Sequence, residues 1–146
     1  MRSPGSQHEE ITHLVTVPVL LDALLTASAT VGAPAALCSV ISSGEALSPV
    51  LAGRCADIWP RAELINTYGT SETWDASYYR VSDRSRVSRT VPIGKPVANA
   101  ALYILDAAGQ PLPPGAVGEL HVGGLALARE YVGNPELTRQ CFVANP

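Results

Sequence analysis

Two short apolar runs separated by a proline-started helical segment constrain the fold of this 146-residue chain more than any other feature. The first run covers residues 37–41 and is bounded by turn-forming residues, and the second is Leu64-Ile65 within a predicted strand over residues 63–66. Between them Ser48 is a good helix cap, and Pro49 fits the first helical position, where no N–H is needed. The order strand, helix, strand predicts a parallel α/β arrangement.

The flanking residues extend this pattern on the N-terminal side. Residues 11–17 are rich in β-branched and apolar side chains and predict a strand or an entry loop. Pro18 begins a predicted helix whose leucines recur at helical spacing over residues 19–29, and Gly32 stops it. We therefore expect residues 11–91 to form a partial parallel sheet with flanking helices, preceded by a flexible polar N-terminus over residues 1–10.

The character of the sequence changes after Pro92. Residues 101–105 and 118–122 predict strands, and residues 106–110 read as a hairpin turn between strands. Asn134 and Pro135 are suited to cap and start a last helix. Residues 92–146 are therefore expected to form a separate, antiparallel β-rich subdomain.

Polar loops follow two of the predicted parallel strands, at residues 42–45 and 66–73. Ligands of open parallel sheets bind beyond the carboxyl ends of the strands, where both loops would lie. The second loop combines an amide, an aromatic ring, a glycine, hydroxyls and a carboxylate, a mixture that is costly to bury without partners. A nucleotide loop uses such groups, but a polar turn after a strand explains them equally well.

Three motifs in a fixed order resolve this ambiguity. Asn66-x-Tyr68-Gly69-x-Ser71-Glu72 resembles the Asn-x-Tyr-Gly-Pro-Thr-Glu motif of adenylate-forming enzymes. The Ile-Gly-Lys-Pro segment in residues 92–97 and the Gly-Glu-Leu…Gly-Gly…Ala-Arg-Glu-Tyr…Pro-Glu-Leu-Thr pattern in residues 118–138 resemble two later motifs of that superfamily. The chain is most similar to the adenylation domains of nonribosomal peptide synthetases, whose fold implies a small β-barrel-like portion after the α/β portion.

The resemblance implies an acid-activating reaction in which a carboxylate and ATP give an acyl-adenylate and pyrophosphate. The implied nucleotide-binding residues are Asn66, Tyr68, Gly69, Ser71 and Gly44, and Glu72 would hold Mg²⁺. The implied acyl pocket contains Thr16, Ile41, Ser43, Thr67, Asp75 and Ala76. In the intact enzyme the implied partners are an amino or carboxylic acid, ATP and a carrier protein domain.

Composition excludes several other classes. The net charge of −3 gives no electrostatic case for nucleic acid, and no apolar run reaches the length of a membrane helix. The N-terminus lacks the apolar region of a signal peptide, so a cytoplasmic protein is expected. Three widely spaced cysteines favour reduced thiols over a zinc site.

Several motifs of the resembled family are missing from these 146 residues. The phosphate loop, the aspartate segment that holds the ribose and the subdomain with the catalytic lysine are not present, so no catalytic set is complete. We therefore expect an internal fragment that is inactive by itself. The alternatives are a fragment of an acyl-CoA synthetase-type enzyme and a non-catalytic remnant that serves as a binding module.

Overall fold

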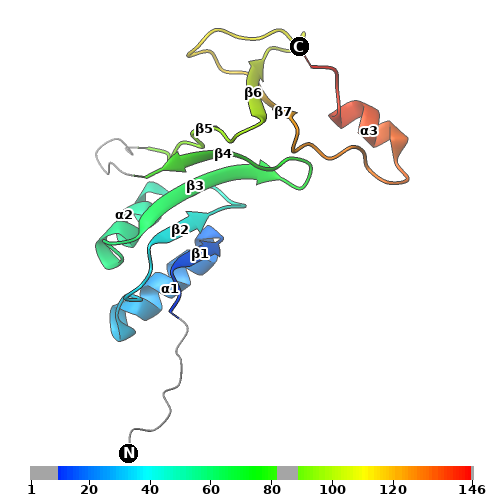
Figure 1. Ribbon diagram of the computed structural model, residues 1–146. Helices are drawn as coiled ribbons and strands as arrows, with labels where there is room; N and C mark the ends of the chain where they lie inside the picture. The colour runs from blue at the N-terminus through cyan, green and yellow to red at the C-terminus, as the bar shows by residue number, and fades with distance from the viewer. Residues whose placement is uncertain (1–9, 82–88, 146) are drawn as a thin grey trace, which may run out of the picture. The chain divides into compact units, whose positions relative to one another are not determined.

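The computed structural model describes residues 10–81 and 89–145. The predicted flexible segment 1–10 lies outside the described residues apart from Glu10. The helices and strands, in chain order, are β1 (His13–Thr16), α1 (Pro18–Val31), β2 (Ser39–Ser42), α2 (Pro49–Ile58), β3 (Glu63–Thr70), β4 (Trp74–Arg80), β5 (Lys95–Pro96), β6 (Ala100–Leu105), β7 (Glu119–Gly124) and α3 (Pro135–Cys141) (Figure 1).

The chain divides into two compact units. One comprises the described residues of Met1–Thr67 and Tyr79–Ile93, and the other comprises Tyr68–Tyr78 and the described residues of Gly94–Pro146. The chain crosses from one unit to the other within β3 and again within β4. The predicted boundary between an α/β subdomain (residues 11–91) and a β-rich subdomain (residues 92–146) stays a prediction.

The predicted parallel α/β arrangement is confirmed. Strands β1, β2 and β3 pair in parallel, with Thr16 opposite Ser42 and Ser42 opposite Asn66. The full sheet has the order β1-β2-β3-β4-β5. The last residues of β1 and β2, Thr16 and Ser42, therefore lie in one row with Asn66, which is inside β3.

Both helices of the first unit begin at the proline expected from the sequence. Pro18 and Pro49 occupy the first turns of α1 and α2, and the Ser48 hydroxyl accepts a hydrogen bond from the Leu51 N–H at 3.1 Å. This bond satisfies one of the N–H groups that a helix start leaves unpaired. One buried cluster joins the helices to the sheet: Leu21, Leu25, Leu51, Cys55, Val40 and Leu64.

The opposite face of the parallel strands has little cover within the described residues. Val15, Ile41 and Ile65 are in register across the three strands, on the face that alternates away from the buried Val40 and Leu64. Val15 is 68% exposed. Parallel strands are usually covered on both faces, and here the helices cover one.

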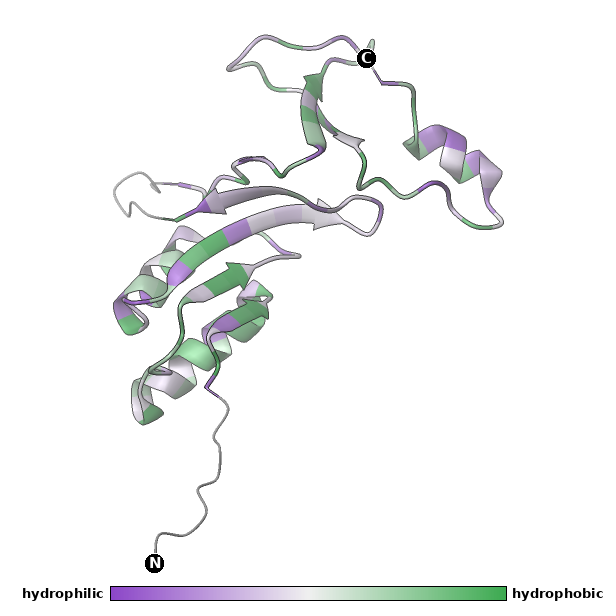
Figure 2. Ribbon diagram, viewed as in Figure 1, coloured by the Kyte–Doolittle hydropathy of each residue, from purple (hydrophilic) through white to green (hydrophobic). Residues whose placement is uncertain are grey.

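The predicted loop at residues 66–73 is partly wrong, because β3 continues through Thr70. Figure 2 shows a green, apolar stretch in the first half of β3 and paler, more polar residues in its second half. Neighbouring strands supply the backbone hydrogen bonds that a polar loop would lack, so pairing overrides the polar composition. Only residues 71–73 connect β3 to β4, and the Thr73 hydroxyl accepts a bond from the Thr70 N–H at 3.0 Å.

The second unit contains the predicted antiparallel pair and the last helix. Strands β6 and β7 pair from Ala100 opposite Gly124 to Leu105 opposite Glu119. Helix α3 starts at Pro135, and the Asn134 side chain accepts from the Leu137 N–H at 3.1 Å. The sheet formed by β6 and β7 has two strands, so the described residues form no closed barrel.

In the part of the chain that the structure describes, none of the helices has the length and apolar character needed to cross a membrane.

Candidate functional site

The first unit places four of the sequence-predicted residues at or next to the row in which β1 and β2 end. Thr16 ends β1, Asn66 lies in the register row opposite Ser42, and the Ser43 N–H donates to the Thr16 carbonyl at 3.0 Å. Gly44 has a φ of 85°, which glycine adopts without strain. The Ser42–Gly44 turn is therefore fixed against the end of β1.

Asn66 is buried, and only one of the two polar atoms of its side-chain amide has a hydrogen-bond partner within the described residues. Its Nδ2 donates to the Pro92 carbonyl at 2.9 Å, which sets the orientation of the amide. Its Oδ1 is buried and, within the described residues, has no hydrogen-bond partner. The same holds for Ser42 Oγ and Thr67 Oγ1. Because unpaired buried polar atoms are costly, these oxygens are suited to partners that a ligand supplies. By strand alternation, Ser42 and Asn66 lie on the helix-covered face and Thr67 lies on the other face.

The predicted acyl-pocket residues of this unit do not share one sheet face. By strand alternation, Ile41 lies on the face turned away from the helices, and so does Thr67. Thr16 alternates to the helix-covered face and is 6% exposed. Sequence reasoning missed this division because the register of β1 against β2 is needed to find it.

The second unit places Tyr68 and Glu72 on one cavity of about 420 Å³. Thr70 lines it from the same strand, and Leu120 and Tyr131 line it from elsewhere in the unit. Tyr68 and Glu72 are both half-buried. The aromatic ring and the carboxylate of the motif thus border the same hollow.

Glu72 is held through both its side chain and its backbone. The Tyr131 hydroxyl donates to Glu72 Oε1 at 2.6 Å, and the Ala128 N–H donates to the Glu72 carbonyl at 2.7 Å. The bond from Tyr131, followed by one from Thr70, holds the pKa of the Glu72 carboxyl below its usual value. The Glu72 carboxylate in turn raises the pKa of Tyr131. Glu72 is therefore ionised at neutral pH.

The remaining motif residues of this unit differ in exposure. Ser71 is exposed in the turn, and Asp75 is half-buried at the start of β4. Ala76 is fully buried, and its carbonyl accepts from the Val97 N–H at 3.0 Å. Gly69 faces the backbone of the adjoining strand, where an added Cβ would lie 2.9 Å from the Asp75 Cα.

Tyr131 and Trp74 were not among the predicted site residues. Tyr131 precedes α3 and lies 59 residues from Glu72, so no local pattern reveals the pair. Trp74 has a φ of 53°, rare for a bulky residue. Glu130 replaces a glycine of the resembled motif, but among the described non-glycine residues only Trp74 and Asn99 have positive φ. The glutamate is therefore not strained there.

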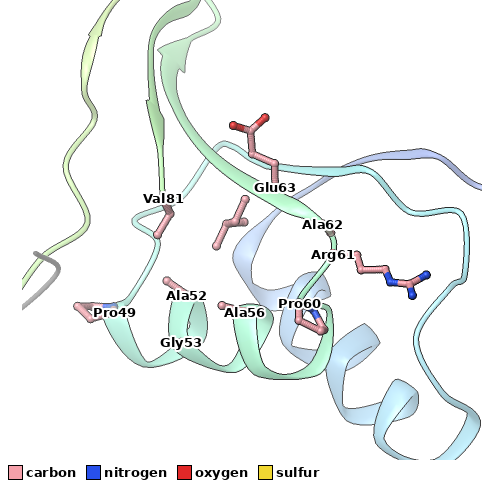
Figure 3. A pocket seen from close by; sticks show the side chains of 10 residues that line it. Pro49, Ala52, Gly53, Ala56, Pro60, Arg61, Ala62, Glu63 and Val81 are labelled. Carbon is pink, nitrogen blue, oxygen red and sulfur yellow. The ribbon is translucent and has the colours of Figure 1, made fainter. Parts of the chain in front are cut away.

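A separate cavity of about 400 Å³ in the first unit lies at the start of β3, beside Glu63 and Leu64 (Figure 3). Ala52, Gly53 and Ala56 of α2 form one wall. Figure 3 shows the charged ends of Glu63 and Arg61 directed away from that wall. With small side chains and no convergent polar groups, this cavity is poorly suited to phosphate.

The chain matches the family of AMP-binding enzymes over residues 6–132 and belongs to that family. It is 42% identical over 139 residues to indigoidine synthase of Dickeya dadantii, covering 93% of this chain and 9% of that protein. It is 40% identical over 138 residues to tyrocidine synthase 2 of Brevibacillus parabrevis, covering 94% of this chain and 4% of that protein. The chain thus spans less than a tenth of these relatives.

Solved structures agree with this assignment. The structure resembles the nonribosomal peptide synthetase FmoA3 in its AMPPNP-bound form with a TM-score of 0.87 at 30% identity, covering 94% of this chain and 15% of that one. It resembles PA1221, which contains adenylation and PCP domains, with a TM-score of 0.83 at 28% identity, covering 92% and 27%. The predicted fold class and the predicted similarity to peptide-synthetase adenylation domains are confirmed.

Proposed function

We propose that these residues are part of a domain that activates an amino acid with ATP. A carboxylate oxygen of the acid bonds to the α-phosphorus, the bond from that phosphorus to the β-phosphate oxygen breaks, and pyrophosphate leaves. Such a reaction depends on positioning and on neutralising charge as it develops. The observation that carries the proposal is the ionised Glu72 carboxylate on the same cavity as the Tyr68 ring.

The residues present fit Mg²⁺ shared with a nucleotide. Mg²⁺ is usually held by one or two carboxylates together with substrate phosphates and waters. The described residues contain no group of three or more His, Cys, Asp or Glu side chains that could form a closed metal site. Glu72 supplies one carboxylate, which suits an ion shared with phosphates. When bound, Mg²⁺ would neutralise phosphate charge.

The other motif residues have complementary roles in the proposal. Tyr68 would stack on the adenine, and the unpaired Asn66 Oδ1 would accept from an adenine amino group. Ser71 is exposed and would donate to the α-phosphate. Gly69 and Gly44 would allow close approach of the backbone. A carrier protein domain would receive the activated acid, and a cytoplasmic location is proposed for the protein.

Two measurements test the proposal. The size of the natural polypeptide that contains these 146 residues is determined by immunoblot, and its amino-acid-dependent ATP–pyrophosphate exchange is then assayed. We expect a polypeptide many times longer that supports exchange, and no exchange from the 146 residues alone. If the natural polypeptide has a mass of about 15.3 kDa and binds nucleotide without turnover, a non-catalytic binding module would replace the proposal.

Asp75 is proposed to meet a polar or cationic group of the acid. The role rests on the resemblance, which implies that Asp75 lines the acyl pocket, and its carboxylate is half-buried at the start of β4. We expect Asp75→Ala to change the ranking of amino acids by about tenfold in kcat/KM, a difference of about 1.4 kcal/mol. The measurement is pyrophosphate exchange with a panel of amino acids on the natural polypeptide. Asp106→Ala, in the β6–β7 turn, is the control, and an unchanged ranking for Asp75→Ala would refute the role.

A further inference from the structure

Tyr131 is fixed from four sides within the second unit. Its N–H donates to the Thr138 hydroxyl at 3.0 Å, and its carbonyl accepts from the Asn134 N–H at 3.0 Å. Its ring meets Phe142 edge-on, with centroids 5.6 Å apart. Its hydroxyl donates to Glu72 Oε1 at 2.6 Å. The backbone and ring contacts hold the phenol in place independently of the carboxylate that it meets.

Glu72, the partner of Tyr131, is also held through its backbone. The Ala128 N–H holds the Glu72 carbonyl at 2.7 Å, three residues before Tyr131 in the chain. The segment from Ala128 to Tyr131 therefore forms hydrogen bonds with both the main chain and the side chain of Glu72. The bonds from Tyr131 and Thr70 use only part of the accepting capacity of the carboxylate, which has about four acceptor positions on its two oxygens.

The chemistry of the donor matters as much as its position. A lysine or arginine at this place would orient the carboxylate but would also oppose a bound cation. A phenol is neutral, so it orients the carboxylate and leaves its negative charge intact. Partners of this kind, which hold a metal-binding side chain by a hydrogen bond, typically change metal affinity 10- to 100-fold when they are removed.

We propose that Tyr131 is a positioning residue that holds Glu72 in the orientation in which it binds a divalent cation together with the nucleotide. The inference rests on the proposed function, in which Glu72 binds Mg²⁺. It extends that function to a residue outside the nucleotide motif. It also gives the segment from Ala128 to Tyr131 a role in metal binding beyond packing.

The test uses Tyr131→Phe, which removes the hydroxyl and keeps the ring that contacts Phe142. Mn²⁺ is titrated into the natural polypeptide with a non-hydrolysable ATP analogue, and free Mn²⁺ is measured by electron paramagnetic resonance. We expect the Kd for Mn²⁺ to rise about tenfold. In pyrophosphate exchange, the apparent KM for Mg²⁺ should rise by a similar factor, and kcat at saturating Mg²⁺ should change little.

Tyr103→Phe is the matched control, because it removes a hydroxyl from a tyrosine of β6 that is not among the residues lining the cavity of Tyr68 and Glu72. It should leave the Kd for Mn²⁺ unchanged. A purely structural role for Tyr131 predicts a lower melting temperature with an unchanged Kd, and this result would overturn the inference. Glu72→Gln separates the two proposals. If it leaves Mn²⁺ binding intact, the proposed function of Glu72 fails; if it weakens binding and Tyr131→Phe does not, only the positioning role fails.

A second measurement does not depend on the stability of Tyr131→Phe. In the wild-type polypeptide with the ATP analogue, bound Mn²⁺ should broaden the ring proton resonances of Tyr131. Sharp Tyr131 resonances at saturating Mn²⁺ would contradict the contact on which the inference depends.

Discussion

Glu72→Gln should lower the kcat of amino-acid-dependent pyrophosphate exchange about 10²- to 10³-fold, the usual loss when one electrostatic contact to a transition state is removed. The amide has the same shape as the carboxylate and still offers an oxygen to the Tyr131 hydroxyl, so the β3–β4 connection should remain folded. The loss therefore reports the missing charge. The assay is performed on the natural polypeptide over a range of Mg²⁺ concentrations.

Glu136→Gln is the matched control for this variant. Glu136 lies on α3 in an exposed ion pair with Arg139, and exposed pairs of this kind contribute little to stability. Its exchange activity should equal that of the wild type. Wild-type kcat for Glu72→Gln at saturating Mg²⁺ would show that the carboxylate takes no part in the reaction.

Gly69→Ala should destabilise the chain by about 3 kcal/mol, at the upper end of what overpacking usually costs. The added Cβ would overlap the Trp74 carbonyl and lie 2.9 Å from the Asp75 Cα, and both are backbone atoms that cannot rotate away. The connection between β3 and β4 must then open or shift. Urea-induced unfolding gives the free energy, and amide hydrogen exchange in β3 and β4 locates the change.

Gly53→Ala is a control for which the change in the free energy of unfolding should have the opposite sign. Gly53 lies inside α2, and an added Cβ there would meet no atom within 4 Å. Alanine in a helix interior is more favourable than glycine by about 0.5–1 kcal/mol, so this variant should gain stability. Equal losses for the two variants would mean that Gly69 is no more restricted by its neighbours than Gly53.

The helix starts could be predicted from the sequence because their determinants are local. Pro18, Pro49 and Pro135 each occupy a first helical turn, and the side chains of Ser48 and Asn134 accept the expected capping bonds. These signals need no knowledge of the rest of the fold. The parallel order of β1, β2 and β3 followed because the segments between these strands are helical.

The details of the candidate site depend on partners that are distant in the chain. The polar second half of β3 was predicted as a loop because its composition is unfavourable for a strand, and the neighbouring strands reverse that preference. The pairing of Tyr131 with Glu72 and the positive φ of Trp74 arise from tertiary contacts and a tight turn. The roles of the motif residues stay predictions, and the sequence did not reveal the contacts that hold these residues.

Because both compact units are built from separated stretches, the order of synthesis limits when each can form. The first unit needs residues from both sides of the β3–β4 connection: the Val81 N–H donates to the Leu64 carbonyl at 2.8 Å, and Val91 belongs to the buried cluster with Leu21 and Val40. A ribosome must therefore release Val91 before the first core is complete. By then residues 68–78, which belong to the second unit, have already emerged and must wait for β7 and α3.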